Sequence, residues 1–326
     1  MEEEKASNLK ALEALLDEFF SSSTDSSRKA EIEKMLTNFS EQSSAWKDCL
    51  FFLAASNNQF VSMFVLTTLE TIIRQRWVGM FGEDKAEIRA TLNNVLYQSH
   101  AAVPQFVRNK LVKLLVDIAR SDWPHFYPEF FTQILTLLTP SSIQSSPASV
   151  ELGLIMLLTA SEEMGSPRPD ISSSRAAELR RQMLMQMNHV STCLVTLLES
   201  CLNTDHSRTP SPSDSSEDSN SMDRQLSYQV LHLPLDQHVQ AVAEKTLACL
   251  AHIFTWCDLT LCVSSRLINV LFQYAFLIIK TQVNIRSFNT VCFLQPASAK
   301  LYFHSLNKPK YQFQAYHCLQ EGWRQQ

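Results

Sequence analysis

Apolar residues recur at steps of three and four in paired segments along most of this 326-residue chain. The clearest pair spans residues 104–138, where one predicted helical face carries Val107, Leu111, Leu114, Leu115 and Ile118. Pro124 disfavours helical backbone at Trp123, so the chain turns there, and Asp122 can cap the helix that restarts. That second helix is expected to place on one stripe Phe126, Phe130, Ile134, Leu137 and Leu138. Two helices joined by a sharp corner form one unit of a helical hairpin array.

Such pairs recur along the chain at a period of roughly 35–40 residues, which is typical of HEAT-type α-solenoids. Because one pair cannot bury its apolar face alone, neighbouring pairs must stack. The sequence therefore predicts an all-α fold. The first N-terminal helix is expected at about 6–20. The second is expected to begin at a cap on Thr24 or Asp25 and the third near Ser43, and the next two are expected at 58–77 and 83–99.

Composition shifts divide the chain into five predicted segments. Residues 1–139 hold the N-terminal repeats, and residues 140–202 hold further repeats after a Ser/Pro linker at 140–149, with helices at about 149–164 and 172–202. Residues 203–227 form a Ser/Pro/acidic segment without core residues, which predicts disorder. Residues 228–280 form another helical repeat, with helices at about 236–257 and 264–280, and residues 281–326 form an irregular tail.

Charge and hydropathy exclude several classes of partner. The net charge of −5 does not suggest nucleic acid. The longest apolar run, at 267–279, is shorter than the 20 or so residues that span a bilayer, so no membrane association is expected. The first residues carry no basic and apolar leader, which favours cytosol or nucleus, with reduced cysteines.

The sequence shows no catalytic constellation. It has no GxSxG, no glycine-rich phosphate loop and no HExxH, so we expect neither an enzyme nor a cofactor. Glu162 and Glu163 are interpreted as a solvated helix face rather than an acid/base pair. A zinc site could be imagined from Cys249, His252, Cys257 and Cys262, but apolar neighbours crowd the same helix and paired CxxC spacing is absent. We therefore interpret these four as packing residues and predict no metal.

Two polar features remain open on the residues alone. The face opposite the apolar stripe of 104–122 carries Arg108, Lys110, Lys113, Asp117 and Arg120, which is a solvated face unless a partner binds it. Thr209, Ser211 and Ser213 lie in Thr-Pro, Ser-Pro and acidic contexts that suit kinases, although an unmodified spacer explains them equally well.

Several segments resemble the importin-β/exportin receptor family. The segment VRNKLVKLLVDIARSDWPHFYPEFF (107–131) resembles that family's N-terminal repeats, in which an Arg-bearing helix precedes a Trp-Pro corner and an aromatic-rich helix. LKALEALLDEFF (9–20) and AEIEKMLTNFSEQSSAWKDCLFFLAAS (30–56) are similar to the opening repeats, and the segments at 152–172 and 247–256 are similar to the next ones. The resemblance covers about 1–280. The tail, with five Lys/Arg against one acid, looks unrelated, so the chain is expected to be a truncated N-terminal fragment.

The resemblance implies a nuclear export receptor that shuttles between nucleus and cytoplasm and has no catalytic residue. Its implied partners are GTP-bound Ran, protein cargo (notably actin–profilin) and nuclear pore proteins. The helices that correspond to the family's Ran-binding inner surface carry Arg74, Arg76, Arg108, Lys110 and Lys113. A generic α-solenoid scaffold for other proteins is the alternative, because composition and periodicity support both equally. So short a chain is expected to bind Ran weakly or not at all and not to carry cargo alone.

Overall fold

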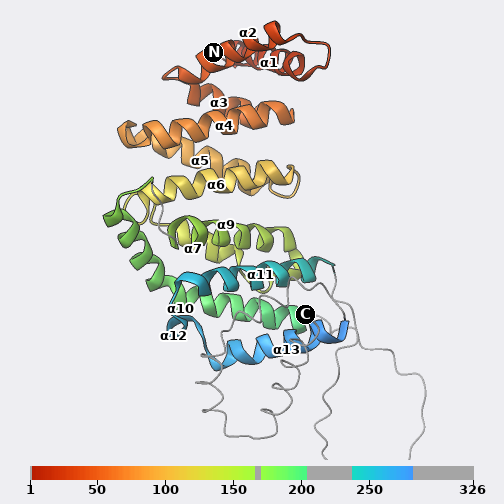
Figure 1. Ribbon diagram of the computed structural model, residues 1–326, viewed down its shortest axis with the longest axis vertical. Coiled ribbons are helices and arrows are strands. Elements are labelled where there is room, and N and C mark those ends of the chain that lie inside the picture. Colours follow the sequence, from red (N-terminus) through yellow and green to blue (C-terminus); the bar gives the residue numbers. More distant parts are fainter. Residues whose placement is uncertain (1, 166–169, 204–236, 282–326) are drawn as a thin grey trace, which may run out of the picture. The chain divides into compact units, whose positions relative to one another are not determined.

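A computed structural model describes residues 2–165, 170–203 and 237–281 of the chain (Figure 1). Within these residues every regular element is a helix, which confirms the all-α prediction. The helices are α1 (Glu2–Phe20), α2 (Ser26–Glu41), α3 (Ala45–Ala55), α4 (Gln59–Arg76), the 3-10 turn η1 (Trp77–Gly79), α5 (Gly82–Ser99), α6 (Gln105–Asp122), α7 (Phe130–Leu137), α8 (Ser142–Ser145), α9 (Pro147–Gly165), α10 (Ser173–Asn203), α11 (Gln237–Trp256), α12 (Leu259–Cys262) and α13 (Ser265–Thr281). Among these helices we find none with both the length and the apolar content that crossing a membrane requires.

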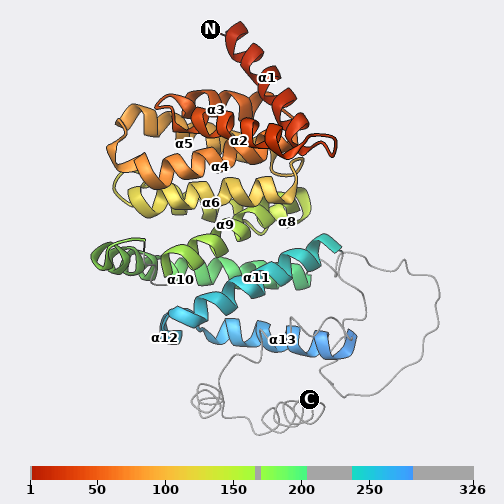
Figure 2. The ribbon, with the colours of Figure 1, turned by 45° about the horizontal axis from the view of Figure 1, so that its top comes forward.

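The chain divides into two compact units, residues 1–267 and 268–326. In the first unit, α4 packs on α6, α6 on α9 and α9 on α11, and Figures 1 and 2 show these four helices following one another. We call them the first row. A helix of the same hairpin backs each of them, since α3 packs on α4, α5 on α6, α7 on α9 and α10 on α11. This stacking of helical pairs is the HEAT-type α-solenoid that the periodicity predicts.

Local capping chemistry sets the helix starts close to where the sequence predicts them. The Asp25 side chain accepts a hydrogen bond from the backbone N–H of Arg28 at 2.8 Å, so the predicted cap of α2 is confirmed. Asn58 caps α4 in the same way, by accepting from the N–H of Phe60 at 2.8 Å. Pro147 opens α9 in the first turn, where its missing N–H leaves no helical hydrogen bond unmade.

The corner after α6 differs from the prediction. Asp122 is the last residue of α6 rather than a cap, and α7 begins only at Phe130, after Glu129. Phe126 was expected on the inward stripe, but it is 73% exposed. Tyr127 is fully buried instead, and its hydroxyl donates to the side-chain oxygen of Gln133 at 2.9 Å. The turn at 123–129 therefore shifts the inward position by one residue.

Two further expectations were wrong in detail. The Ser/Pro segment at 140–149 is not a plain linker, because α8 lies within it and α9 has already begun at Pro147. The sequence at 58–77 is apolar nearly all round the helix, which predicts burial on all sides, yet Phe60 is 41% and Met63 50% exposed on α4. One stripe of the first row is therefore open to solvent.

Candidate partner-binding surface

The exposed stripe of α4 follows directly from helical spacing. Positions three or four residues apart share a face, and the exposed ones on α4 are Phe60, Met63, Thr67, Thr71 and Arg74. The opposite face is buried against α3 and α6 by Val61, Val65, Leu69 and Ile72. The stripe therefore runs from an apolar start to a basic end.

The two arginines at the end of α4 have different environments. Arg74 is exposed, and no side-chain partner is seen for it within the described part of the chain. Arg76 turns back to α2, where its guanidinium donates to the backbone oxygens of Gln42 at 3.0 Å and Glu41 at 2.9 Å. Carbonyls at a helix end lack intrahelical donors, so Arg76 caps α2. Arg74 is the one of the two that a partner can reach without disturbing the fold.

The basic residues of α6 are paired with carboxylates rather than free. Lys110 lies 2.5 Å from a carboxylate oxygen of Glu70, which links α6 to α4. Lys113 contacts Asp117 on its own helix at 2.5 Å and Glu163 of α9 at 3.5 Å. Arg108 is half-buried, and its Nε has no hydrogen-bond partner among the described residues.

Further along α6 the ion pairs are buried. The Arg120 guanidinium lies 3.3 Å from Asp117, 3.7 Å from Glu163 and 2.8 Å from Asp170. The side chains of Arg120 and Asp117 are only 8% and 7% exposed. Burial works to lower the pKa of Arg120, but the Asp170 and Asp117 carboxylates outweigh it and raise that pKa overall. Arg120 and Asp117 were interpreted as part of a solvated face, and so were Glu162 and Glu163. Of these four residues, only Glu162 is exposed.

The third junction of the first row is also ionic. Lys245 of α11 lies 3.3 Å from a carboxylate oxygen of Glu151 on α9. Each successive pair of first-row helices is thus joined by at least one ion pair between helices, and we call this set the ion-pair ladder. Its pairs are Glu70–Lys110, Lys113–Glu163 and Glu151–Lys245.

Two arginines, Arg89 and Arg175, hold the corner that follows α6. Asp122 accepts from the indole N–H of Trp77 at 3.0 Å and from Arg89 at 3.1 Å, which ties α6 to η1 and α5. Arg175 of α10 donates to the backbone oxygens of Arg120, Ser121 and Trp123. Arg89 and Arg175 carry no motif, so only the fold reveals their role.

The cysteine and histidine side chains of α11 and α12 fall into separate contacts. The Cys249 thiol contacts the backbone oxygen of Leu154 at 3.4 Å, and His252 Nδ1 lies 2.9 Å from the hydroxyl of Ser161. Cys257 and Cys262 meet each other, with their sulfur atoms 3.0 Å apart. The structure therefore does not bring the four predicted packing residues together. Thr209, Ser211 and Ser213 lie outside the described residues.

Family models match two adjoining parts of the chain. The model described as importin-beta N-terminal domain matches residues 32–98, and the model described as exportin 1-like protein matches residues 104–292, more than half of the chain. The chain belongs to the importin-β/exportin family. Its HEAT-type α-solenoid and its Trp-Pro corner are those expected of that family.

Curated members of the importin-β/exportin family include several with high similarity to this chain. It is 42% identical to "Exportin-6" of Mus musculus and 41% identical to "Exportin-6" of Homo sapiens, each over 286 residues that cover 84% of this chain and 25% of the relative. It is 40% identical to "Exportin-6" of Danio rerio, over 84% of this chain and 24% of the relative. The chain thus spans about a quarter of the length of these relatives, and the family match reaches residue 292, beyond the limit of about 280 expected from the sequence.

Proposed function

We propose that this chain acts as part of a nuclear export receptor similar to exportin-6, which binds GTP-bound Ran and protein cargo, with actin–profilin as the cargo. The observation that carries the proposal is the 42% identity to "Exportin-6" of Mus musculus over 84% of this chain. Such a receptor contacts nuclear pore proteins and shuttles between nucleus and cytoplasm. It has no catalytic role.

The proposed mechanism is non-covalent. Ran·GTP and cargo each stabilise the receptor conformation that the other prefers, so each binding event raises the affinity for the other. GTP hydrolysis on Ran removes this coupling and releases the cargo. The present chain provides stacked helical surface to this process rather than a reacting group.

The proposed Ran-facing residues are Arg74, Arg76, Arg108, Lys110 and Lys113. Their environments differ in how readily each charge is available to a partner. Arg74 is exposed at the end of the α4 stripe, so it offers its charge at little cost. Lys110 must exchange Glu70 for an acidic group of Ran, and Lys113 must exchange Asp117 and Glu163. Arg76 contributes least, because it caps α2.

This difference in availability predicts the effect of charge reversal. Arg74→Glu lowers the affinity for Ran·GTP by about tenfold, since opposing like charges at an interface weakens association. Lys34→Glu makes the same charge change at an exposed position of α2 and is expected to leave the affinity unchanged. Titration calorimetry measures the difference when both variants are made in a chimera that joins residues 1–280 of this chain to the rest of mouse exportin-6. Equal affinities for the two variants would remove Arg74 from the interface.

The alternative function is that of an α-solenoid scaffold for other proteins. Stacked helical pairs serve such scaffolds equally well, so the fold does not favour either function. Nucleotide-dependent binding of Ran separates the two.

The experiment compares Ran·GTP and Ran·GDP as ligands of two proteins. One is this chain, and the other is a chimera in which its residues 1–280 replace the matching quarter of mouse exportin-6. We expect weak or no binding by the chain alone and a clear preference of the chimera for Ran·GTP. If the chimera folds but binds both nucleotide forms equally, this chain serves a different partner.

A further inference from the structure

Two cysteines at the turn after α11 lie in direct contact. Cys257 follows the last residue of α11, and Cys262 ends α12, so the pair flanks a short turn. Their sulfur atoms lie 3.0 Å apart, and both residues are buried, at 6% and 3% exposed. Cys249 and Cys193 have no such contact with another thiol among the described residues.

Helix α10 holds both ends of this turn in place. Arg180 donates to the backbone oxygen of Trp256 at 2.5 Å, and the Ser191 hydroxyl donates to the backbone oxygen of Cys262 at 2.6 Å. These two bonds fix the backbone on either side of the thiol pair. The cysteines are therefore held in contact by the fold, and only a small closing movement separates their sulfur atoms from bonding distance.

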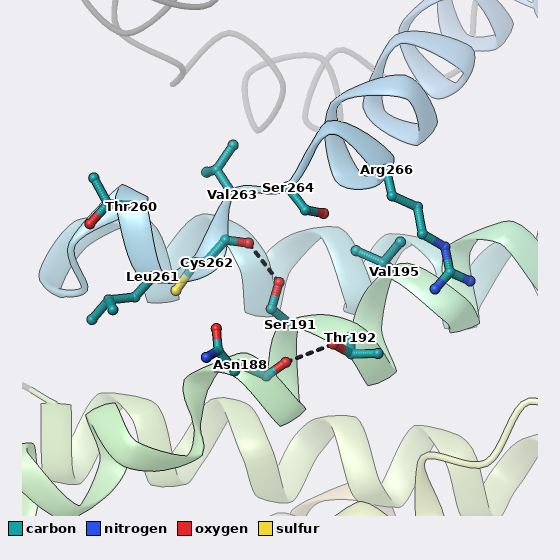
Figure 3. A pocket seen from close by; sticks show the side chains of 10 residues that line it. All are labelled: Asn188, Ser191, Thr192, Val195, Thr260, Leu261, Cys262, Val263, Ser264 and Arg266. Atoms are coloured by element: carbon teal, nitrogen blue, oxygen red, sulfur yellow. Dashed lines mark hydrogen bonds between the residues drawn. The ribbon is translucent and has the colours of Figure 1, made fainter.

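A small oxidant can approach the pair at Cys262, which lines a surface pocket. Cys262 lines a pocket of about 160 Å³ between α10 and the segment 260–266, and Figure 3 shows it there beside Leu261 and across from Asn188. A pocket of this volume holds molecules the size of water or hydrogen peroxide. Thr260 and Ser264 lie on one wall of this pocket, and Thr192 of α10 lies on the opposite wall.

Access decides which thiol reacts first. Burial raises the pKa of both Cys257 and Cys262, so neither is favoured as a thiolate by its surroundings. Cys262 lines the pocket, and Cys257 is not among its lining residues. Cys262 is therefore the sulfur that meets the oxidant, and Cys257 is the resolving one.

We propose that Cys257 and Cys262 are a redox modification site that closes to an intrachain disulfide on exposure to hydrogen peroxide. The Cys262 thiolate attacks one peroxide oxygen, the O–O bond breaks, and the departing hydroxide takes up a proton to form water. The resulting sulfenic acid is attacked by the sulfur of Cys257, an S–S bond forms, the S–O bond breaks, and a second water leaves. Two thiols lose two electrons and two hydrogens, and the peroxide is reduced to two waters. The product ties the residue after α11 to the last residue of α12.

The test uses the 326-residue chain, fully reduced and then treated with increasing hydrogen peroxide. Free thiols are alkylated, and the protein is digested with trypsin and with chymotrypsin, the second of which cuts between the two cysteines at Leu259 and Leu261. The expected product is a linked peptide pair that carries Cys257 and Cys262 and has lost two hydrogens. It should form at peroxide doses that leave Cys193 and Cys249 alkylatable, in protein whose circular dichroism is unchanged.

Two variants complete the test. Cys193→Ser, which alters a half-buried thiol on α10, should leave the linkage unchanged. Cys257→Ser should abolish the linkage and leave Cys262 as a sulfenic acid that dimedone traps. The wild-type chain is enough to overturn the proposal. Any of three results would do so: Cys257 and Cys262 stay alkylatable after Cys193 is oxidised, Cys257 links to another cysteine, or the pair links only after the protein unfolds.

Discussion

Gly165 ends α9 against the indole ring of Trp256. A Cβ at this position would lie 2.6 Å from Cε2 of that ring, closer than carbon atoms can approach. The ring cannot retreat easily, because its N–H donates to the Ser161 hydroxyl at 2.8 Å and Arg180 lies over its face. Gly165 therefore marks a close approach of α9 to Trp256 of α11.

We predict that Gly165→Ala lowers the free energy of unfolding by about 2 kcal/mol, because overpacking forces a buried aromatic ring to shift. Gly82→Ala is the matched control, since a Cβ at Gly82 meets nothing within 4 Å and alanine favours the helix that begins there. Urea denaturation of both variants measures the difference. A neutral Gly165→Ala would mean that α9 and α11 separate without cost.

Single residues also mark where sequence reasoning failed. The cap at Asp25 was predictable, because a short acidic side chain before a helical run has one dominant use. The burial of Glu163 and Asp117 was not, because helical spacing identifies a polar face but does not say which helix will cover it. Phe126 was predicted to be buried but is exposed, and Tyr127 is buried in its place, because a turn has no period from which to count.

At the scale of elements, the ion-pair ladder joins each helix of the first row to the next. A charge buried between two helices is stable only opposite its partner, so each pair favours one relative position of its helices. The buried cluster around Arg120 is the strongest such constraint, since three carboxylates lie within 4 Å of it. The exposed pair Arg28–Glu18 provides the contrast.

Arg120→Met is expected to cost about 3 kcal/mol of unfolding free energy, because it leaves the buried carboxylates of Asp117 and Glu163 with Lys113 as their one remaining cation among the described residues. Arg28→Met removes a pair whose side chains are each 40% exposed, and it should leave the unfolding free energy almost unchanged. Thermal and urea denaturation give both values. Equal losses for the two variants would contradict the idea that burial gives the Arg120 cluster its weight.

Helix positions were the most predictable feature of the elements. Apolar spacing and caps placed α4, α5, α9, α10, α11 and α13 within one or two residues of their observed ends. The short helix α8 and the late start of α7 escaped prediction, because four to eight residues are too few to display a period. The candidate surface was predictable only as a set of basic residues, since the exposure of each depends on its carboxylate neighbours.

For the whole molecule, repetition of one helical pair predicted the stacked fold, and an ordered run of motifs predicted the family. The first row presents an open α4 stripe beside lysines of α6 that already have partners. Our account is that Ran·GTP binds across these two helices and draws first on Arg74. The rest of the receptor strengthens this contact, because the chain spans only a quarter of the length of its relatives.

Hydrogen–deuterium exchange of the exportin-6 chimera, with Ran·GTP and with Ran·GDP, tests this account most directly. Amide exchange reports local opening residue by residue, so it locates a contact as well as detecting one. We predict that Ran·GTP slows exchange in α4 and α6, that Ran·GDP does not, and that α2 is unaffected in both. Binding of Ran·GTP without any slowing in α4 or α6 would contradict the account, because Ran would then be held by another part of the receptor.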